Sequence, residues 1–216
     1  IDELLARYEL DGIELDFMRQ EWAFNPAEAW EKRRILTDFI RDIRNRCQAG
    51  NSIGHPVGLM VRVPLNPECC RTGGFDMEEW MRRGLIDLVV AGTNEVDFSP
   101  DLSQLIQWGR QYRIPVFGDL ELFPVQAHSN HTPLTQDQSS AQYHVGSTEL
   151  PIQEVEYMLH GMTDVLKAQG VDGFYMFNFP CFRNDLVAAG RVRSQEEMAI
   201  FARILRTAGA TSHEEN

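Results

Sequence analysis

Pairs of acidic residues occur at alternate positions in two short apolar segments of the sequence. Glu14 and Asp16 stand in the run IELDF, and Asp119 and Glu121 stand in the run PVFGDLEL. Side chains alternate between the two faces of a strand, so each pair would share one face. Burying an unpaired carboxylate costs on the order of several kcal/mol, so two acids on one face need partners or a purpose. Two carboxyl groups that share a space can serve as the acid and the base of a reaction.

Other polar groups accompany these acids near the ends of apolar segments. In residues 57–63 the odd positions are apolar and Arg62 points the other way, while Asn178 falls in the run FYMFNF. Arg19 and Trp22 follow the first acidic run closely. Two interpretations stay open for this set: an internal network in which the arginines neutralise the acids, and a functional site. Because perturbed ionisable groups cluster at functional sites, we favour the second for the set as a whole.

The elements that would position these residues follow a repeating order of strand, loop and helix. Each apolar segment is short and is followed by a run with the spacing of an amphipathic helix. Strands that alternate with helices in this way predict a parallel sheet in an α/β fold. We expect strands at 13–17, 57–63, 85–90, 115–122 and 173–179, and helices that begin near Asn25, Asp76, Ser99, Pro151 and Ser194.

Two architectures could hold such a sheet, an open doubly wound sheet and a closed barrel. The doubly wound fold favours a glycine-rich phosphate loop after a strand. The sequence contains no GxGxxG and neither GxxxxGKS nor GxxxxGKT. A barrel gathers polar residues at the C-terminal ends of its strands, where its active site lies. The acids and the arginine near the strand ends therefore favour the barrel.

Five segments with strand-like patterns are spread over most of the chain. The segment YELDGIELDFMR is followed in order by GLMVRVP, GLIDLVVAG, IPVFGDLE and DGFYMFNFP. In their order these segments resemble the glycoside-hydrolase-like barrels, in particular the family-10-like glycosyl hydrolases. The resemblance implies a (β/α)8 TIM barrel of which this chain holds strands four to eight, with strands one to three upstream of Ile1. We expect residues 1–206 to be the C-terminal part of one barrel domain, and residues 207–216 to be a frayed tail.

The same resemblance implies a glycosidase with two catalytic acids, at the ends of strands four and seven. Here these are Asp16, or Glu14, and Glu121, or Asp119. We expect Asp16 to donate the proton and Glu121 to act as nucleophile or base, because each lies nearer the C-terminal mouth of the barrel than its neighbouring acid. The expected substrate-binding residues are Arg19, Trp22, Arg62 and Asn178.

The run DGIELDF also resembles the DxxDxDxE strand of chitinase-like enzymes. Asp11, Glu14 and Asp16 fall on its acidic positions, but Met18 takes the place of the final glutamate, which is the acid in that family. This departure argues against chitinase-type, substrate-assisted chemistry. It also keeps a second function class open, a barrel that binds carbohydrate or serves as a scaffold without catalysis.

Composition restricts the partners. A net charge of −12 makes nucleic acid and anionic membranes poor partners, so the expected partners are a carbohydrate substrate and the rest of the barrel. The four cysteines have no zinc spacing and the histidines of residues 122–150 form no metal motif, so we expect neither metal nor cofactor. The only lysines, Lys32 and Lys167, fall in expected helices, which disfavours Schiff-base chemistry. The location of the protein stays open, with secretion and the periplasm among the alternatives.

Overall fold

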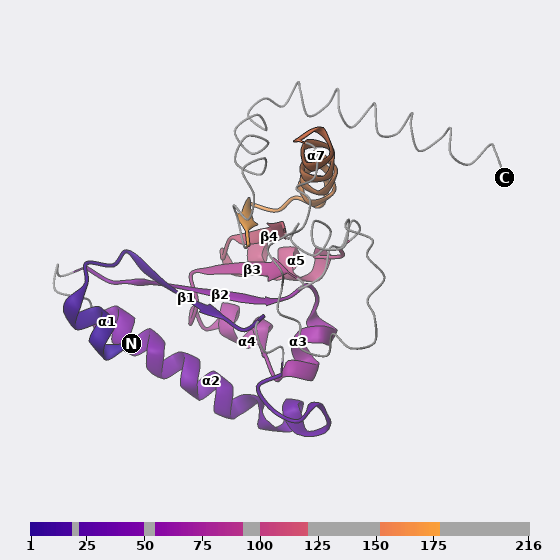
Figure 1. Ribbon diagram of the computed structural model, residues 1–216. Coiled ribbons are helices and arrows are strands. Elements are labelled where there is room, and N and C mark those ends of the chain that lie inside the picture. The colour runs from indigo at the N-terminus through magenta and orange to yellow at the C-terminus, as the bar shows by residue number, and fades with distance from the viewer. Residues whose placement is uncertain (19–21, 50–54, 93–99, 121–151, 178–216) are drawn as a thin grey trace, which may run out of the picture. The chain divides into compact units, whose positions relative to one another are not determined.

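The structure is a computed structural model that describes residues 1–18, 22–49, 55–92, 100–120 and 152–177 (Figure 1). The chain divides into two compact units. Nearly all of the sheet belongs to the first unit, and so does the candidate site. This unit contains Ile1–Asn94, Pro100–Asp119 and Leu166–Tyr175.

Five strands form one parallel sheet, in the order in which they occur along the chain. Helices separate them, so the expected α/β class is confirmed. The strands are β1 (Gly12–Asp16), β2 (Gly58–Pro64), β3 (Leu88–Gly92), β4 (Val116–Leu120) and β5 (Gly173–Met176). The helices are α1 (Asp2–Arg7), α2 (Pro26–Ala49), α3 (Pro67–Gly73), α4 (Met77–Arg82), α5 (Ser103–Tyr112) and α7 (Ile152–Gln169).

Local capping chemistry explains where several helices begin. The side chain of Asn25 accepts a hydrogen bond from the N–H of Ala27 at 3.1 Å, as expected for the residue that precedes α2. Helix α5 begins at Ser103 rather than near Ser99, and the side chain of Asp101 accepts the N–H of Ser103 at 3.0 Å. The short helix α3 was not predicted, although Asn66 caps it and a proline follows at its first position. The helix expected after Ser194 lies outside the described residues, as does the expected tail at 207–216.

One expected strand begins later than predicted. Strand β3 begins at Leu88, whereas the apolar run in the sequence begins at Leu85. The N–H of Leu85 is bonded to the carbonyl of Trp80 at 2.9 Å, so Leu85 closes the end of α4 instead of joining the sheet. The apolar side chain of Leu85 is buried at that helix end. A prediction based on hydrophobicity alone therefore assigned Leu85 to the strand.

The odd-numbered residues of β1 and β2 face helices. Leu59 and Val61 are fully buried, and Figure 1 shows α2, α3 and α4 along one side of these two strands. Directly after β1, the ring of Phe17 lies 5.1 Å from that of Phe75 and 6.2 Å from that of Trp80. The expected packing of this face on helices is confirmed, and the even-numbered residues are left on the opposite, inner face.

The sheet curls so that side chains of its first and last strands meet. In a flat sheet β1 and β5 would lie about 19 Å apart, which is four strand spacings of about 4.8 Å. The hydroxyl of Tyr175 in β5 nevertheless lies 3.1 Å from Oε2 of Glu14 in β1. Neither side chain spans the flat distance, so the sheet itself must be curved. A curved parallel sheet of five strands is compatible with part of a barrel.

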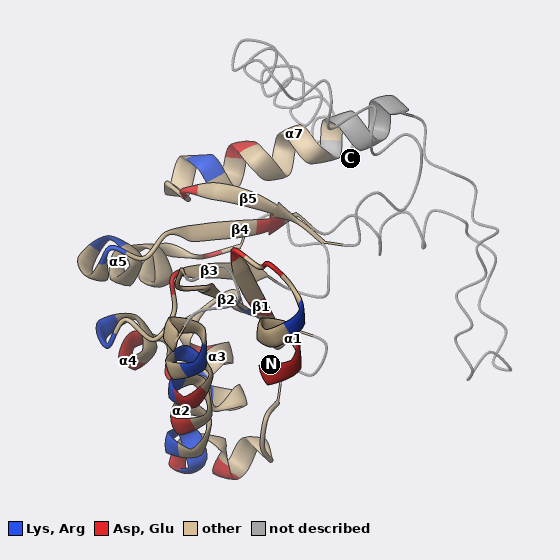
Figure 2. Ribbon diagram, turned by 90° about the vertical axis from the view of Figure 1, so that its left-hand side faces the viewer, with Lys and Arg blue, Asp and Glu red and all other residues tan. Residues whose placement is uncertain are grey.

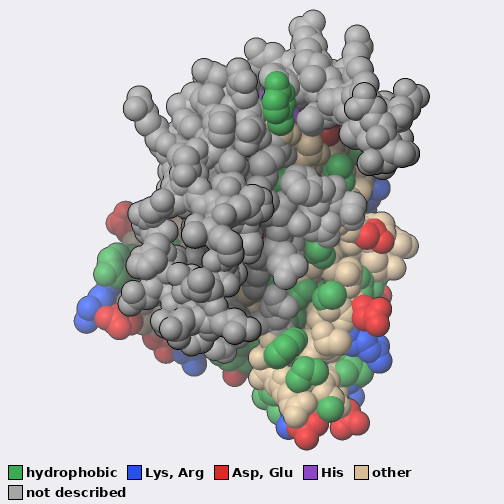
Figure 3. Space-filling view, turned by 45° about the vertical axis from the view of Figure 1, so that its right-hand side comes forward, with side chains coloured by type: hydrophobic (Ala, Val, Ile, Leu, Met, Phe, Trp, Pro, Cys, Tyr) green, Lys and Arg blue, Asp and Glu red, His purple; other side chains and the backbone are tan. Residues whose placement is uncertain are grey.

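The helices carry most of the charge in the described part of the chain. Figure 2 shows lysine, arginine, aspartate and glutamate concentrated on the helices, while the strands carry few charged residues. These are acidic positions on β1 and β4, and Arg62 on β2. On the face seen in Figure 3, small groups of hydrophobic side chains lie between charged ones. Among the described helices, none is both long enough and apolar enough to span a membrane.

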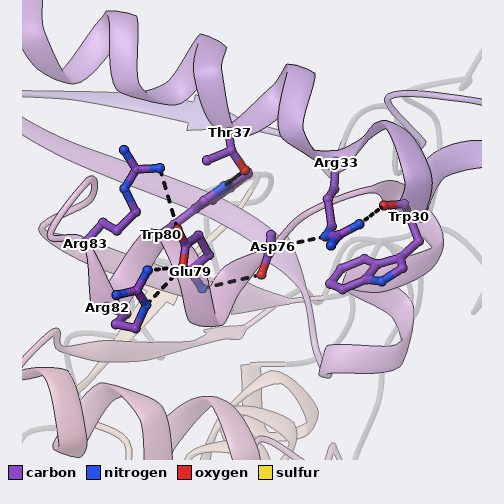
Figure 4. Close-up of polar contacts among 8 residues, drawn as sticks. All are labelled: Trp30, Arg33, Thr37, Asp76, Glu79, Trp80, Arg82 and Arg83. Carbon is purple, nitrogen blue, oxygen red and sulfur yellow. Dashed lines mark hydrogen bonds and ion pairs between the residues drawn. The ribbon is translucent and has the colours of Figure 1, made fainter.

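A polar contact network links α4 to α2 (Figure 4). Asp76 accepts the N–H of Glu79 at 3.4 Å, which caps α4, and it pairs with Arg33 of α2 at 3.2 Å. Deeper in the same contact, the indole N–H of Trp80 donates to the hydroxyl of Thr37 at 2.9 Å, and both side chains are buried. Asp76 therefore serves two purposes, the start of one helix and its attachment to another.

Two substitutions of Asp76 should distinguish its capping of α4 from its ion pair with Arg33. Asp76→Ala removes the cap and the ion pair, and should lower the free energy of unfolding by about 1–2 kcal/mol. Asp76→Asn keeps a capping side chain and loses only a partly exposed ion pair, which should cost less than about 1 kcal/mol. Urea unfolding followed by circular dichroism measures both values, and an equal loss in the two variants would contradict the capping role.

Candidate functional site

Arg62 lies at the centre of the inner face of the sheet. Its side chain is 0% exposed. Nε and Nη2 of Arg62 donate to Oδ2 of Asp119 at 2.8 and 2.6 Å, and Nη1 donates to Oδ1 of Asp16 at 3.2 Å. The register explains half of this arrangement, because Asp16 of β1 stands directly opposite Arg62 of β2. One buried cation therefore links carboxylates from β1 and β4.

A glycine on β3 makes room for the pair that crosses it. Asp119 is two strands away from Arg62, so its carboxylate must reach over the end of β3. A Cβ atom on Gly92 of β3 would lie only 2.7 Å from the Cβ of Asp119 and 2.9 Å from its Cγ. Any other residue at this position would therefore push the Asp119 carboxylate away from the guanidinium.

A third carboxylate joins the cluster from the N-terminal side of β1. Glu14 accepts the hydroxyl hydrogen of Tyr175 at Oε2, at 3.1 Å. The ring of Tyr175 also lies near the guanidinium, with its centroid 5.9 Å from Cζ of Arg62. The described cluster therefore contains Glu14, Asp16, Arg62, Asp119 and Tyr175, contributed by four of the five strands.

The charges in this cluster do not balance. Three carboxyl groups face one guanidinium, so full ionisation would leave a net charge of −2 within the described cluster. Burial raises the pKa of Asp119 to about 6, although Arg62 opposes this shift. Burial also raises the pKa of Glu14, while its hydrogen bond from Tyr175 lowers it. A proton held on Asp119 below about pH 6 reduces the excess negative charge.

Two carboxylate oxygens of the cluster are buried with no hydrogen-bond partner among the described residues. They are Oε1 of Glu14 and Oδ1 of Asp119. On Asp119 the other oxygen already accepts two N–H groups from Arg62, so Oδ1 is the atom that can carry the proton. The site thus holds a buried carboxyl group that is able to exchange a proton, beside a second carboxylate, Asp16, whose side chain is 27% exposed.

The predicted site residues divide into three groups. Asp16, Glu14, Asp119 and Arg62 come together around one guanidinium, as their strand positions predicted. Trp22 is 62% exposed, and the N–H of the following residue donates to the carbonyl of Gly73 at the end of α3. The remaining predicted residues, Arg19, Glu121 and Asn178, lie outside the described residues.

Tyr175 is the cluster member that sequence reasoning missed. The expected inner face of the last strand contained Phe174 and Met176, but Tyr175 points to Glu14 while the other two are 37% exposed. The predicted inner face of this strand was wrong. All residues of β5 are apolar or aromatic, so the alternation of polar and apolar residues does not indicate which face points inward. A weak signal did exist, because a buried tyrosine needs a partner for its hydroxyl and the predicted inner face offered acids.

Met18 replaces the final acid of the chitinase-like pattern and is buried. Its backbone N–H donates to Oδ1 of Asp16 at 2.9 Å, so this turn helps to orient the Asp16 carboxylate. Within the described ranges, no group of three or more histidine, cysteine, aspartate or glutamate side chains is arranged to hold a metal ion. What the described cluster offers is therefore carboxyl groups, one guanidinium and one phenol.

Neither a model of a known protein family nor a curated protein matches this chain. The family resemblance therefore rests on the sequence segments themselves and stays a prediction.

The raised pKa of Asp119 predicts a specific pH dependence of stability. The folded chain holds a proton on Asp119 up to about pH 6, whereas the unfolded chain releases it near pH 4. Stability should therefore be highest at the low end of this range and fall as the pH rises from about 4 to about 6, by up to about 3 kcal/mol. Asp119→Asn should remove this part of the slope in urea unfolding measured at several pH values.

Asp42→Asn, an exposed change on α2, is the matched control and should keep the parent slope. Parallel slopes in the parent and in Asp119→Asn would show that folding does not raise the pKa of Asp119.

The clearance at Gly92 gives a second test of the cluster. Gly92→Ala places a methyl group against the Asp119 side chain and should cost about 1–3 kcal/mol of folding free energy through overpacking. Gly58→Ala on the same inner face is the control, because its Cβ would meet nothing closer than 3.4 Å and should change stability by less than about 1 kcal/mol. Equal stabilities of the two variants in denaturant unfolding would mean that Asp119 does not need this space.

Proposed function

We propose that this chain is part of a (β/α)8 barrel that hydrolyses a carbohydrate by paired-carboxylate acid and base chemistry. One observation supports it above all: Arg62 gathers Asp16 and Asp119 on the inner face, near the C-terminal ends of their strands. Barrel enzymes place their catalytic groups at this end of the strands. The curvature of the sheet and the helices that cover its other face support a barrel as the architecture.

In this proposal Asp16 is the carboxyl group that meets the substrate. Its side chain is 27% exposed, whereas that of Asp119 is 1% exposed and tied to Arg62. Glycosidases need a second carboxyl group about 5–9.5 Å away, as nucleophile or base. We assign that role to Glu121 on the sequence pattern alone, because it follows Asp119 by two residues and alternation would place it on the same face.

A second candidate is a barrel that binds carbohydrate, or serves as a scaffold, without catalysis. The observation that favours it is the complete burial of the Arg62 side chain, which is already paired with Asp16 and Asp119, since such a network can hold the strands of a curved sheet together with no further purpose. The buried Met18 at the position of the chitinase-like acid agrees with it as well.

Hydrolysis by substituted proteins separates the two candidates. Asp16→Asn and Glu121→Gln, made in the full-length protein, should each lower kcat/KM by about 100-fold or more on whichever member of an oligosaccharide and aryl-glycoside panel the parent cleaves. Both changes keep the side-chain volume, so the unfolding midpoint should stay close to that of the parent.

Asp42→Asn on α2 is the control and should retain parent activity within about two-fold, since it is a surface change. Parent-like turnover in both site variants would contradict the assignment of the acids. A parent that binds oligosaccharides in calorimetry but cleaves none of the panel would support the binding module instead.

A further inference from the structure

Tyr175 approaches the carboxylate cluster from the strand furthest from β1. Its hydroxyl donates to Oε2 of Glu14 at 3.1 Å across 161 positions of the sequence, and its ring lies beside the Arg62 guanidinium. The other oxygen of Glu14 is buried and has no hydrogen-bond partner within the described part of the chain. The phenol is therefore the group that fixes the orientation of the Glu14 carboxylate.

We propose that Tyr175 is a positioning residue: its hydroxyl holds the Glu14 carboxylate in one orientation beside Arg62 and favours its charged form, so that Asp119 is the buried carboxyl group left to hold a proton. The catalytic consequence of this inference rests on the proposed function. The hydrogen bond between Tyr175 and Glu14 is independent of that function, because it is a property of the folded chain.

The ionisation of the groups around Glu14 agrees with this division of roles. The groups that act on Glu14 are Asp16 on its own strand, Arg62 on β2 and Tyr175 on β5, and Asp119 on β4 responds to its charge. Burial and the neighbouring Glu14 raise the pKa of Tyr175 to about 12, so the phenol stays protonated and remains a donor at neutral pH. Its hydrogen bond opposes the burial that raises the pKa of Glu14.

Loss of the phenol should therefore change two carboxyl groups in opposite directions. Without the donor, the charged form of Glu14 is less favoured and the pKa of Glu14 rises further. A neutral Glu14 no longer repels charge on Asp119, so the pKa of Asp119 falls. A side chain that only fills space would not produce this pair of shifts.

The experiment is a carboxyl titration of the full chain, labelled with ¹³C at glutamate and aspartate side chains, for the parent and Tyr175→Phe. We expect the midpoint of Glu14 to rise by about one pH unit in the variant, with Glu14→Gln used to assign its signal. Tyr112→Phe is the matched control, because it removes a hydroxyl that donates to a glutamate, Glu78, on the exposed surface at 3.3 Å. It should leave the Glu14 midpoint unchanged.

A Glu14 midpoint within about 0.2 pH units of the parent in a folded Tyr175→Phe variant would overturn the inference. A second measurement covers the catalytic consequence. In the hydrolysis assay, Tyr175→Phe should lower kcat by about ten-fold with little change in KM, and it should have no further effect in a Glu14→Gln background.

The titration and the hydrolysis assay distinguish failure of the hydrolase proposal from failure of the positioning role of Tyr175. If the parent cleaves no glycan, the hydrolase proposal fails, and the titration alone decides whether Tyr175 holds Glu14. If the parent is active and the titration shifts, but kcat of Tyr175→Phe equals that of the parent, then Tyr175 sets an ionisation that the reaction does not use, and its positioning role is refuted.

Discussion

A guanidinium that is fully withdrawn from water must be matched by negative charge, and here carboxylates from two strands supply it. Arg62 joins Asp16 of β1 to Asp119 of β4, so strands that are not neighbours are linked across the inner face. Removing Arg62 would leave the buried Asp119 carboxylate without its cation, and breaking a buried pair in this way costs about 3–5 kcal/mol. Much of the arrangement of the inner face follows from this requirement.

The backbone around Arg62 is adapted to the same requirement. Gly92 on β3 carries no side chain at the point where Asp119 crosses to the guanidinium. The curvature of the sheet brings Tyr175 of the last strand to Glu14 of the first. On the outer face, the apolar residues of the same strands are buried against helices, so that one face supplies the core and the other collects the polar groups.

Sharing one cation among three carboxyl groups has chemical consequences. Burial disfavours the charged form of Asp119 and raises its pKa to about 6, even though Arg62 donates two hydrogen bonds to it. The neighbouring carboxylates Asp16 and Glu14 raise this pKa further. The cluster can therefore hold or release a proton near pH 6, which an ordinary surface ion pair cannot do.

Local sequence patterns were enough to predict the class of fold and part of the site. Alternation identified the helix-packed face of β1 and β2, and it placed Glu14, Asp16, Arg62 and Asp119 on the other. The starts of α2 and α4 followed from capping residues whose chemistry is local. These predictions succeeded because a strand of period two, or a helix cap, depends on residues only a few positions apart.

Other features depended on contacts between distant parts of the chain. The position of Tyr175 could not be predicted from the sequence, because both faces of β5 are apolar or aromatic. Only the curvature of the sheet brings the Tyr175 hydroxyl to Glu14. The need for glycine at position 92 arises from Asp119, which is 27 positions away and reaches it through the packing of β3 beside β4. The sequence by itself determined which residues would face inward on β1, β2 and β4. Only the tertiary structure decided which of them share a charge, because ion pairing depends on distances that strand curvature sets.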